Sequence, residues 1–497
     1  MLLLLLGITV TFAVFLPVNP WPVDGWFESQ YRLVGHFPGA DNYTPIAAPA
    51  VFFKLTHEIA ALLGFGLEGE MYVASIAQNL LVFIAAWLVY RSCAYLSSIR
   101  VASALSVAFL IYVLAAGLAQ SFWSESVVLA LLSGVLFLNL RLYFEPTSSS
   151  RRFWWTAALA SVLLGLAVIT RVIPVLIIPA AVLLLDGRLN RRRLIGYAAL
   201  ASIVTVTVVV AMMAGNFVRF GRAEITNSSG RHLWEGVRDM VDDSLAGSAQ
   251  FAELTRANGK LQGLNHWQVK VPQARDAIER DRILGGLAKE AIRKQPVRFI
   301  KLGLVGFSDT IGQPVYRLGF GARSTHPDPL HRDEMLPPLA AKVSGVVSNI
   351  AGRVIARFYW LGTWLYPVVI FLTMSTGLAQ AWQVRTRRAW IAPLVIGIAL
   401  LAIIRFDTVA ARTTFERYLP LALCVLLLAW QVIAAMRGAP RRVFDTPRVY
   451  LFAALVFFGS LWCGWQIEDD NTRNLVPYLP FLLAMAAMAI DGRRQRP

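Results

Sequence analysis

Residues 124–142 read SESVVLALLSGVLFLNLRL, and this stretch decides the class of fold. No charged side chain stands between Glu125 and Arg141. A helix needs about 20 mostly apolar residues to cross a bilayer, so the stretch predicts a membrane-spanning helix. The whole chain has the same character: 57% of its 497 residues are hydrophobic and 15% are charged, whereas soluble domains carry about 25% charged residues. An ordinary soluble enzyme is therefore excluded.

Similar apolar stretches recur along the chain and predict an all-α polytopic membrane protein with about 12 transmembrane helices. The predicted spans cover residues 2–17, 71–90, 101–119, 124–142, 153–170, 172–186, 194–214, 358–382, 389–405, 418–436, 449–465 and 475–490. They form an N-terminal module at 1–214 and a C-terminal module at 358–497, separated by an outer loop region at 215–357. The first span lacks the basic leader and the cleavage site of a signal peptide, so we expect it to be retained.

Arginines mark alternate connections between the spans and predict the orientation of the chain. Short loops rich in lysine and arginine stay on the cytoplasmic side. Every second connection fits this rule: 91–100, 141–152, 188–193, 385–388, 437–448 and 493–496. Both termini are then cytoplasmic, and the first outer loop, 18–70, lies outside with 215–357. The net charge of +17 follows from these loops, so nucleic acid is not an expected partner.

The outer region 215–357 shows one clear helical pattern. Apolar residues at helical spacing alternate with charges over 275–301, which predicts an amphipathic helix. Residues 302–316 and 338–355 are moderately apolar, and the pattern fits either interfacial helices or one further pair of spans. The region contains no cysteine, so no disulfide framework is expected there.

No cofactor is firmly indicated by the sequence. His326 and His331 lie near Asp328, Asp333 and Glu334, and such side chains bind divalent cations. Their spacing matches no known metal site, and the proline-rich context favours a solvated loop, so no metal site is predicted. Gly64, Gly66 and Gly69 spell a dinucleotide-binding pattern, but no βαβ unit surrounds them.

Asp24 and Glu28 are the first candidate catalytic residues. They are four positions apart in the first outer loop, so in a helix they would share one face just above the membrane. A carboxylate held there can serve as a general base on a hydroxyl. The alternative is that Asp24 caps a short helix while Glu28 is solvated.

Glu125 is the third candidate, because it opens the fourth predicted span from the outer side. An ionisable side chain at that depth is costly and points to function. The alternative is an acid that only favours a helix start through the helix dipole.

Three arginines fall at the outer ends of predicted spans: Arg171, Arg417 and Arg473. A guanidinium group binds phosphate oxygens through two parallel hydrogen bonds. Each arginine could therefore hold a lipid phosphate, or it could extend to lipid head groups as an anchor. These arginines and the three acidic candidates all lie on the predicted outer side of the membrane, so we expect the reactive groups there.

The ordered set of motifs resembles the GT-C glycosyltransferases, multispanning enzymes that take a sugar from a polyprenyl-phosphate donor, such as protein O-mannosyltransferases and the aminoarabinose transferase of lipid A. The resemblance runs over nearly the whole chain, through short motifs. They are an acidic first outer loop with Asp24, Ser124-Glu125, GLAVITR at 165–171, TNSSGRHLWEG at 226–236, AKEAIRKQPVRF at 288–299 and RYLP at 417–420. The family's paired Asp-Glu in the first loop is absent here, since Gly25 follows Asp24.

The resemblance implies an inverting transferase at the outer face of a bacterial inner membrane, with a lipid, polysaccharide or protein as acceptor. It implies Asp24 as the general base, Glu28 or Glu125 as positioning residues, and Arg171 with Arg417 on the departing phosphate. Arg473 and Arg231, the latter within the 226–236 motif, are further candidates for phosphate binding.

A transporter or lipid flippase is the competing class, and a membrane scaffold is a smaller one. Transporters usually place ionisable residues near the middle of the membrane. The predicted spans carry their charges at their ends, which favours the enzyme.

Overall fold

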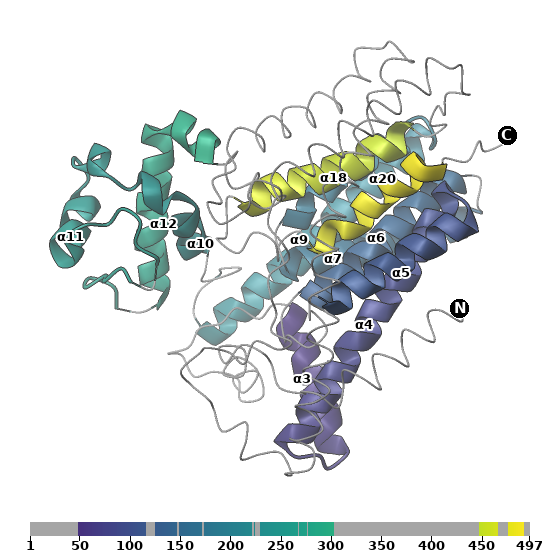
Figure 1. Ribbon diagram of the computed structural model, residues 1–497, viewed down its shortest axis with the longest axis horizontal. Helices are drawn as coiled ribbons and strands as arrows, with labels where there is room; N and C mark the ends of the chain where they lie inside the picture. The colour runs from purple at the N-terminus through teal and green to yellow at the C-terminus, as the bar shows by residue number, and fades with distance from the viewer. Residues whose placement is uncertain are drawn as a thin grey trace, which may run out of the picture.

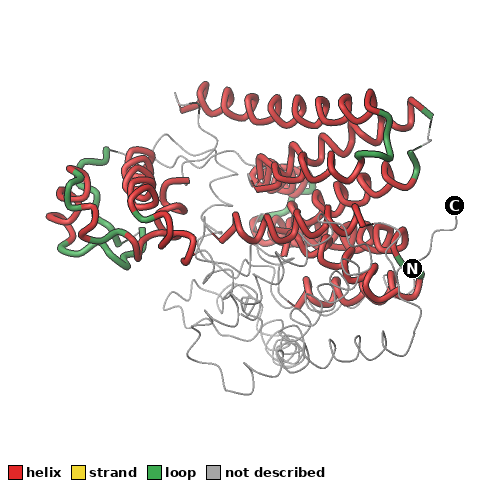
Figure 2. Tube along the Cα trace, turned by 90° about the horizontal axis from the view of Figure 1, so that it is seen from above, coloured by secondary structure: helices red, strands yellow, loops and turns green. Residues whose placement is uncertain are grey.

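The structure, a computed structural model, describes residues 48–115, 125–146, 149–170, 173–220, 223, 229–266, 268–275, 277–302, 447–465 and 476–491. The regular elements within these ranges are α-helices and short 3-10 helices (Figure 2). The all-α class predicted from the sequence is therefore confirmed for the part of the chain that the structure describes.

Eleven of these elements form a helical bundle (Figure 1). They are α3 Ala48–Leu62, α4 Leu67–Leu96, α5 Ile99–Ala115, α6 Glu125–Phe144, α7 Ser150–Thr170, η2 Ile173–Leu176, α8 Ile177–Leu185, α9 Arg191–Phe220, α18 Pro447–Trp465, η6 Val476–Tyr478 and α20 Leu479–Asp491.

Four helices of the bundle are long and apolar enough to cross a membrane. They are Ile76–Leu96, Glu125–Phe144, Ser150–Thr170 and Arg191–Gly215, and each overlaps a predicted span. Shorter apolar helices, at Ile99–Leu110, Pro174–Leu185, Arg448–Phe457 and Leu479–Met488, coincide with four more. The remaining predicted spans lie outside the described residues, so the total of 12 stays a prediction.

The stretch predicted as a span at 172–186 differs from the other helices. It forms a 3-10 turn and a nine-residue α-helix, η2 and α8, and is shorter than the length a bilayer normally requires. Pro174 and Pro179 lack the backbone N–H that a continuous helix would use. A hydropathy profile detects the apolar stretch but not the break in the helix at these prolines.

The bundle packs its helices partly in parallel pairs. Gln78 of α4 donates a hydrogen bond to Ser126, at the start of α6, at 3.2 Å. Near the other end, Tyr95 of α4 donates to Glu145, just after α6, at 2.8 Å. The two helices therefore run in the same direction, as expected when one helix, α5, returns the chain between them.

The basic connections meet at one end of the bundle. Arg193 donates to the carbonyl oxygen of Pro146 at 2.7 Å, and the Arg188 guanidinium lies 4.7 Å from the centre of the Tyr143 ring. Arg448 lies 3.9 Å from the carboxylate of Asp186. We call this the arginine end and the opposite one, where α6 begins, the Glu125 end. Loops far apart in sequence thus gather as the alternation of arginines predicts.

A labelling experiment tests the orientation of the bundle. In a chain whose three native cysteines are replaced by alanine, a cysteine at Ser228 should react with an impermeant thiol reagent in intact cells, whereas a cysteine at Ser149 should not. Ser149 lies at the arginine end, and loops of that kind stay in the cytoplasm. Equal labelling of the two positions in intact cells, with both reactive after lysis, would contradict the predicted topology.

A second packed unit follows α9, and we call it the outer unit after the predicted outer region 215–357 in which it lies. It contains α10 Ser229–Val237, η3 Arg238–Met240, η4 Asp243–Leu245, α11 Ala249–Asn258 and α12 Ala277–Lys294. The amphipathic helix predicted over 275–301 is present as α12. The outer unit has its own hydrophobic core, centred on Trp234, Leu254, Leu284 and Leu287, and it stands apart from the bundle in both views (Figures 1 and 2).

Candidate functional site

Two of the predicted site residues fall within the described part of the chain. Glu125 is the first residue of α6, and Arg231 lies in α10 of the outer unit. They belong to different packed units, so no common site is formed by this pair alone. The other predicted site residues lie outside the described residues: Asp24, Glu28, Arg171, Arg417 and Arg473. Helix α7 ends at Thr170, directly before Arg171.

Glu125 lies in a polar cluster at the Glu125 end of the bundle. Its side chain is 0% exposed, and Gln78, Asn79 and Ser126 are equally buried. The hydrogen bond from Gln78 to Ser126 joins α4 to α6 directly beside it. An acid that only favours a helix start gains its dipole interaction at the surface and needs no burial. Burial of a carboxylate among amides and hydroxyls is costly and favours the functional interpretation of Glu125.

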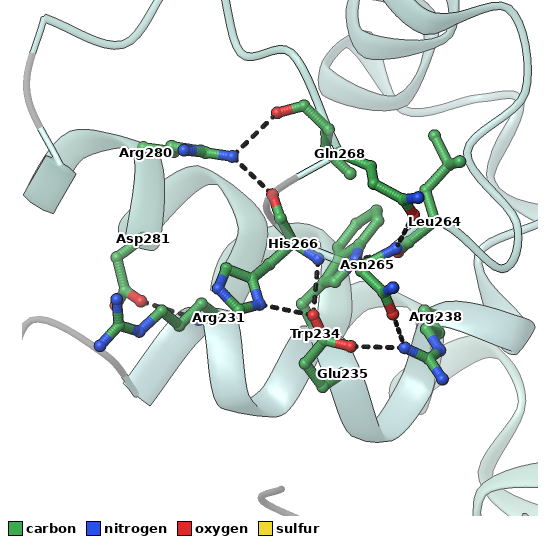
Figure 3. A network of polar contacts seen from close by, with 11 residues as sticks. Arg231, Trp234, Glu235, Arg238, Leu264, Asn265, His266, Gln268, Arg280 and Asp281 are labelled. Atoms are coloured by element: carbon green, nitrogen blue, oxygen red, sulfur yellow. Dashed lines mark hydrogen bonds and ion pairs between the residues drawn. The ribbon is translucent and has the colours of Figure 1, made fainter. Parts of the chain in front are cut away.

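The outer unit is organised around a second buried carboxylate, Glu235 (Figure 3). Its Oε1 lies 2.5 Å from Nδ1 of His266 and accepts a hydrogen bond from the backbone N–H of His266 at 2.6 Å. Its Oε2 accepts from Arg238 at 2.7 Å, and Arg238 also donates to Asn265. Both carboxylate oxygens are therefore satisfied, and α10 is tied to the loop that carries His266.

The environment of Glu235 holds its pKa below the ordinary value for glutamate. Burial alone would raise the pKa, but the hydrogen bonds from the ring and backbone of His266 and the charge of Arg238 outweigh that effect. The ionised form is thus favoured in the folded state. This carboxylate is set up as a fixed anion that orients His266, which is the usual role of an acid beside an imidazole.

The outer unit should become less stable in acid, with Glu235 responsible for part of the loss. Because its pKa is depressed on folding, its contribution is fully present above the ordinary value of 4.5 and disappears as the pH falls through the folded-state pKa. Thermal unfolding between pH 7 and pH 3 measures this. The variant Glu235→Gln should be less stable at pH 7 and decline less in acid; an equal decline in both proteins would contradict the assignment.

Asp281 of α12 caps the start of α10. Its Oδ2 accepts from the backbone N–H of Gly230 at 2.8 Å, and its Oδ1 accepts from that of Arg231 at 2.7 Å. A carboxylate at this position satisfies two N–H groups that have no partner within the helix and complements the helix dipole. Arg231 thus has a structural role through its backbone, which is separate from the phosphate-binding role predicted for its side chain.

The described residues of the two motifs, 229–236 and 288–299, belong to the same packed unit. Helix α10 packs on α12 with Trp234 fully buried between them, and the Trp234 indole donates to the carbonyl oxygen of Leu264 at 2.8 Å. At the other end of α12, Gln295 donates to the carbonyl oxygen of Met240 at 2.9 Å, and Arg298 donates to that of Asp239 at 2.7 Å. Both motifs therefore hold the outer unit together.

Sequence reasoning did not single out several polar residues of these two sites. Gln78 occurs within a predicted span, and Glu235 lies inside a quoted motif without a separate role. The pairing of Glu235 with His266 spans 31 positions and follows no helical or strand period. All six histidines of the chain fall in segments predicted to be outer loops, a pattern that marks the region but not the partner.

The described residues contain no group of three or more histidine, cysteine, aspartate or glutamate side chains that could hold a metal ion. The histidines and acids at 326–334 lie outside these residues.

Comparison with known proteins returns no relative. No family model matches the chain, and neither a curated protein nor a solved structure shows significant similarity to it.

Proposed function

We propose that the protein is an inverting glycosyltransferase that takes a sugar from a polyprenyl-phosphate donor at the outer face of a bacterial inner membrane. Asp24 removes the proton of the acceptor hydroxyl, and Glu28 or Glu125 positions the sugar or the acceptor. Arg171 and Arg417 stabilise the departing phosphate, since fixed cations facing developing negative charge lower the barrier most in a water-poor site. Arg473 and Arg231 are further candidates for contact with the donor phosphate.

The observation that carries this proposal is the complete burial of Glu125 at the end of the bundle that lies opposite the arginine end. A lipid-linked donor keeps its isoprenoid tail in the bilayer and presents its phosphate and sugar at the boundary. A site for that donor therefore needs polar side chains at one end of the membrane helices. Gln78, Ser126 and Glu125 lie at such a position.

The distribution of charge supports an enzyme over a transporter or flippase. In the described helices α4, α6, α7 and α9 the ionisable side chains stand near the helix ends, such as Glu125 and Arg141 on α6. Transporters and proton relays place ionisable groups within the membrane. An enzyme that reacts at one face of the membrane needs ionisable side chains only near the helix ends, where they stand in the described helices.

Replacing Glu125 with glutamine tests the proposal. Glutamine is similar in size and keeps hydrogen-bonding capacity, but it lacks the charge, so we expect the fold to survive and sugar transfer to fall about 100-fold, as misplacement of a reacting group does. The assay gives purified protein a radiolabelled polyprenyl-phosphate sugar and membrane-derived acceptors. Glu145→Gln, which removes an acid at the arginine end, is the matched control and should remain active.

Two outcomes would contradict the proposal. The first is full transfer activity in Glu125→Gln at unchanged thermal stability, which would remove Glu125 from the site. The second is translocation of a labelled lipid across proteoliposomes by the wild-type protein without any sugar transfer, which would favour the flippase.

A further inference from the structure

Four exposed arginines lie at the arginine end, on the first turns of α7 and α9: Arg151, Arg152, Arg191 and Arg192. The two helices begin next to each other. Arg193 of α9 donates to the carbonyl oxygen of Pro146, just before α7, at 2.7 Å, and its guanidinium lies 5.0 Å from the centre of the Phe153 ring. Arg193 thus links the starts of the two helices. The other four arginines are exposed on the same first turns.

Two tryptophans, Trp154 and Trp155, follow these arginines within about one turn of α7. The ring of Trp154 packs against Gly196 of α9 so closely that a Cβ at Gly196 would lie 2.4 Å from a ring carbon. Trp155 is 68% exposed. Tryptophan is enriched at the boundary between head groups and acyl chains. The arginines, which lie closer to the start of the helix than the tryptophans, are then at the level of the head groups.

An exposed apolar stripe continues from Trp155 along α7. Leu159 and Val162 follow it at helical spacing and are exposed, so the three side chains share one face. On α9, Ile195 and Ile203 are exposed as well. The arginines therefore stand at the end of a surface that faces the acyl chains of the bilayer.

Among the described residues, the acidic side chains at this end already lie beside basic ones. At the same end, Glu145 pairs with Arg141 at 3.2 Å and accepts from Tyr95, and Asp186 lies beside Arg448. The helix dipoles of α7 and α9 present their positive ends at the same place. None of the ion pairs formed within the described ranges involves these four guanidinium groups, so they are suited to bind an anion from outside the chain.

We propose that the starts of α7 and α9 form a binding site for one anionic phospholipid of the leaflet at the arginine end. Its phosphate binds the guanidinium groups of Arg151 and Arg192, which suit phosphate oxygens in geometry and charge. Its acyl chain lies along Trp155, Leu159 and Val162. The site is distinct from the Glu125 end and does not depend on the proposed transferase activity.

Lipid retention measured by native mass spectrometry tests this site. Purified full-length protein is exchanged into mixtures of phosphatidylcholine with cardiolipin or phosphatidylglycerol, and the bound lipid is quantified. The double variant Arg151→Gln/Arg192→Gln should bind the anionic lipid about 25-fold more weakly, because each arginine near an anionic lipid contributes about a factor of five. The control Arg91→Gln/Arg100→Gln removes two charges from the same end and should bind as the wild type does.

Three results would overturn the proposal. Unchanged retention in the double variant excludes the site, and equal loss in both double variants shows a diffuse charge effect. Displacement of the lipid by equimolar inorganic phosphate shows a general anion site. Thermal unfolding in phosphatidylcholine alone should be the same for the wild type and Arg151→Gln/Arg192→Gln; if this double variant is unstable, Arg192→Gln alone should weaken retention about fivefold.

Discussion

Replacement of Asp24 by asparagine should abolish sugar transfer while donor binding remains largely intact. Asparagine matches aspartate in size and can still cap a helix, so a purely structural role would survive the substitution. It cannot accept a proton, so the proposed role as general base would not. Loss of a general base commonly costs about 100- to 10,000-fold in rate, which separates the two roles clearly. The measurement is the rate of transfer from a polyprenyl-phosphate sugar by purified protein.

The comparison requires wild type and Asp24→Asn with matched thermal stability. Retention of donor affinity in the inactive variant distinguishes loss of chemistry from loss of binding. If the variant transfers sugar at more than about a tenth of the wild-type rate, a smaller loss than removal of a base causes, Asp24 is a cap. Glu28 and Glu125 are then the remaining candidates for the base.

Replacement of Gly230 by alanine should have the largest effect on the outer unit. A Cβ at this position would lie 1.9 Å from the backbone carbonyl oxygen of Asp281, and that oxygen belongs to the rigid helix α12. Helix α10 must therefore move away, which opens the core around Trp234 and breaks the cap from Asp281. Overpacking of this kind costs about 3 kcal/mol, and the lost cap adds about 1 kcal/mol.

Limited proteolysis and thermal unfolding measure this effect. Gly247→Ala provides the matched control, since a Cβ there meets nothing within 4 Å. It should leave protease resistance unchanged. If Gly230→Ala is as stable as Gly247→Ala, then the close approach of α10 and α12 is not needed for the outer unit.

Much of the bundle follows from local sequence alone. The run from Glu125 to Arg141 is apolar, and α6 covers Glu125–Phe144, within two residues of the predicted span. The span predicted at 71–90 overlaps the segment Ile76–Leu96 that could cross a membrane, whereas the helix that contains it, α4, begins earlier, at Leu67. A hydropathy profile reports how long an apolar stretch is. A helix extends beyond that stretch wherever its backbone hydrogen bonds continue.

The contacts of the candidate site were harder to predict from the sequence than the helices were. Burial of Glu125 could be anticipated from its place at the start of a span. The hydrogen bond from Gln78 to the adjacent Ser126 could not be anticipated, because it joins positions 48 apart and depends on α4 and α6 packing in parallel. The same holds for Asp281, which caps a helix that begins about 50 residues earlier. Such pairings arise from tertiary packing, which no local pattern encodes.

The contact between α20 and α4 has a consequence for biosynthesis. The thiol of Cys93 on α4 lies 3.8 Å from the carbonyl oxygen of Leu483 on α20, 390 positions later. At about 5 to 20 residues per second, a ribosome needs about 20 to 80 seconds to cover that interval. During this time the face of α4 that receives α20 must be covered by lipid or by an insertion factor. A ribosome that stalls after α18 therefore leaves a nascent chain in which this face of α4 stays exposed for quality control to recognise.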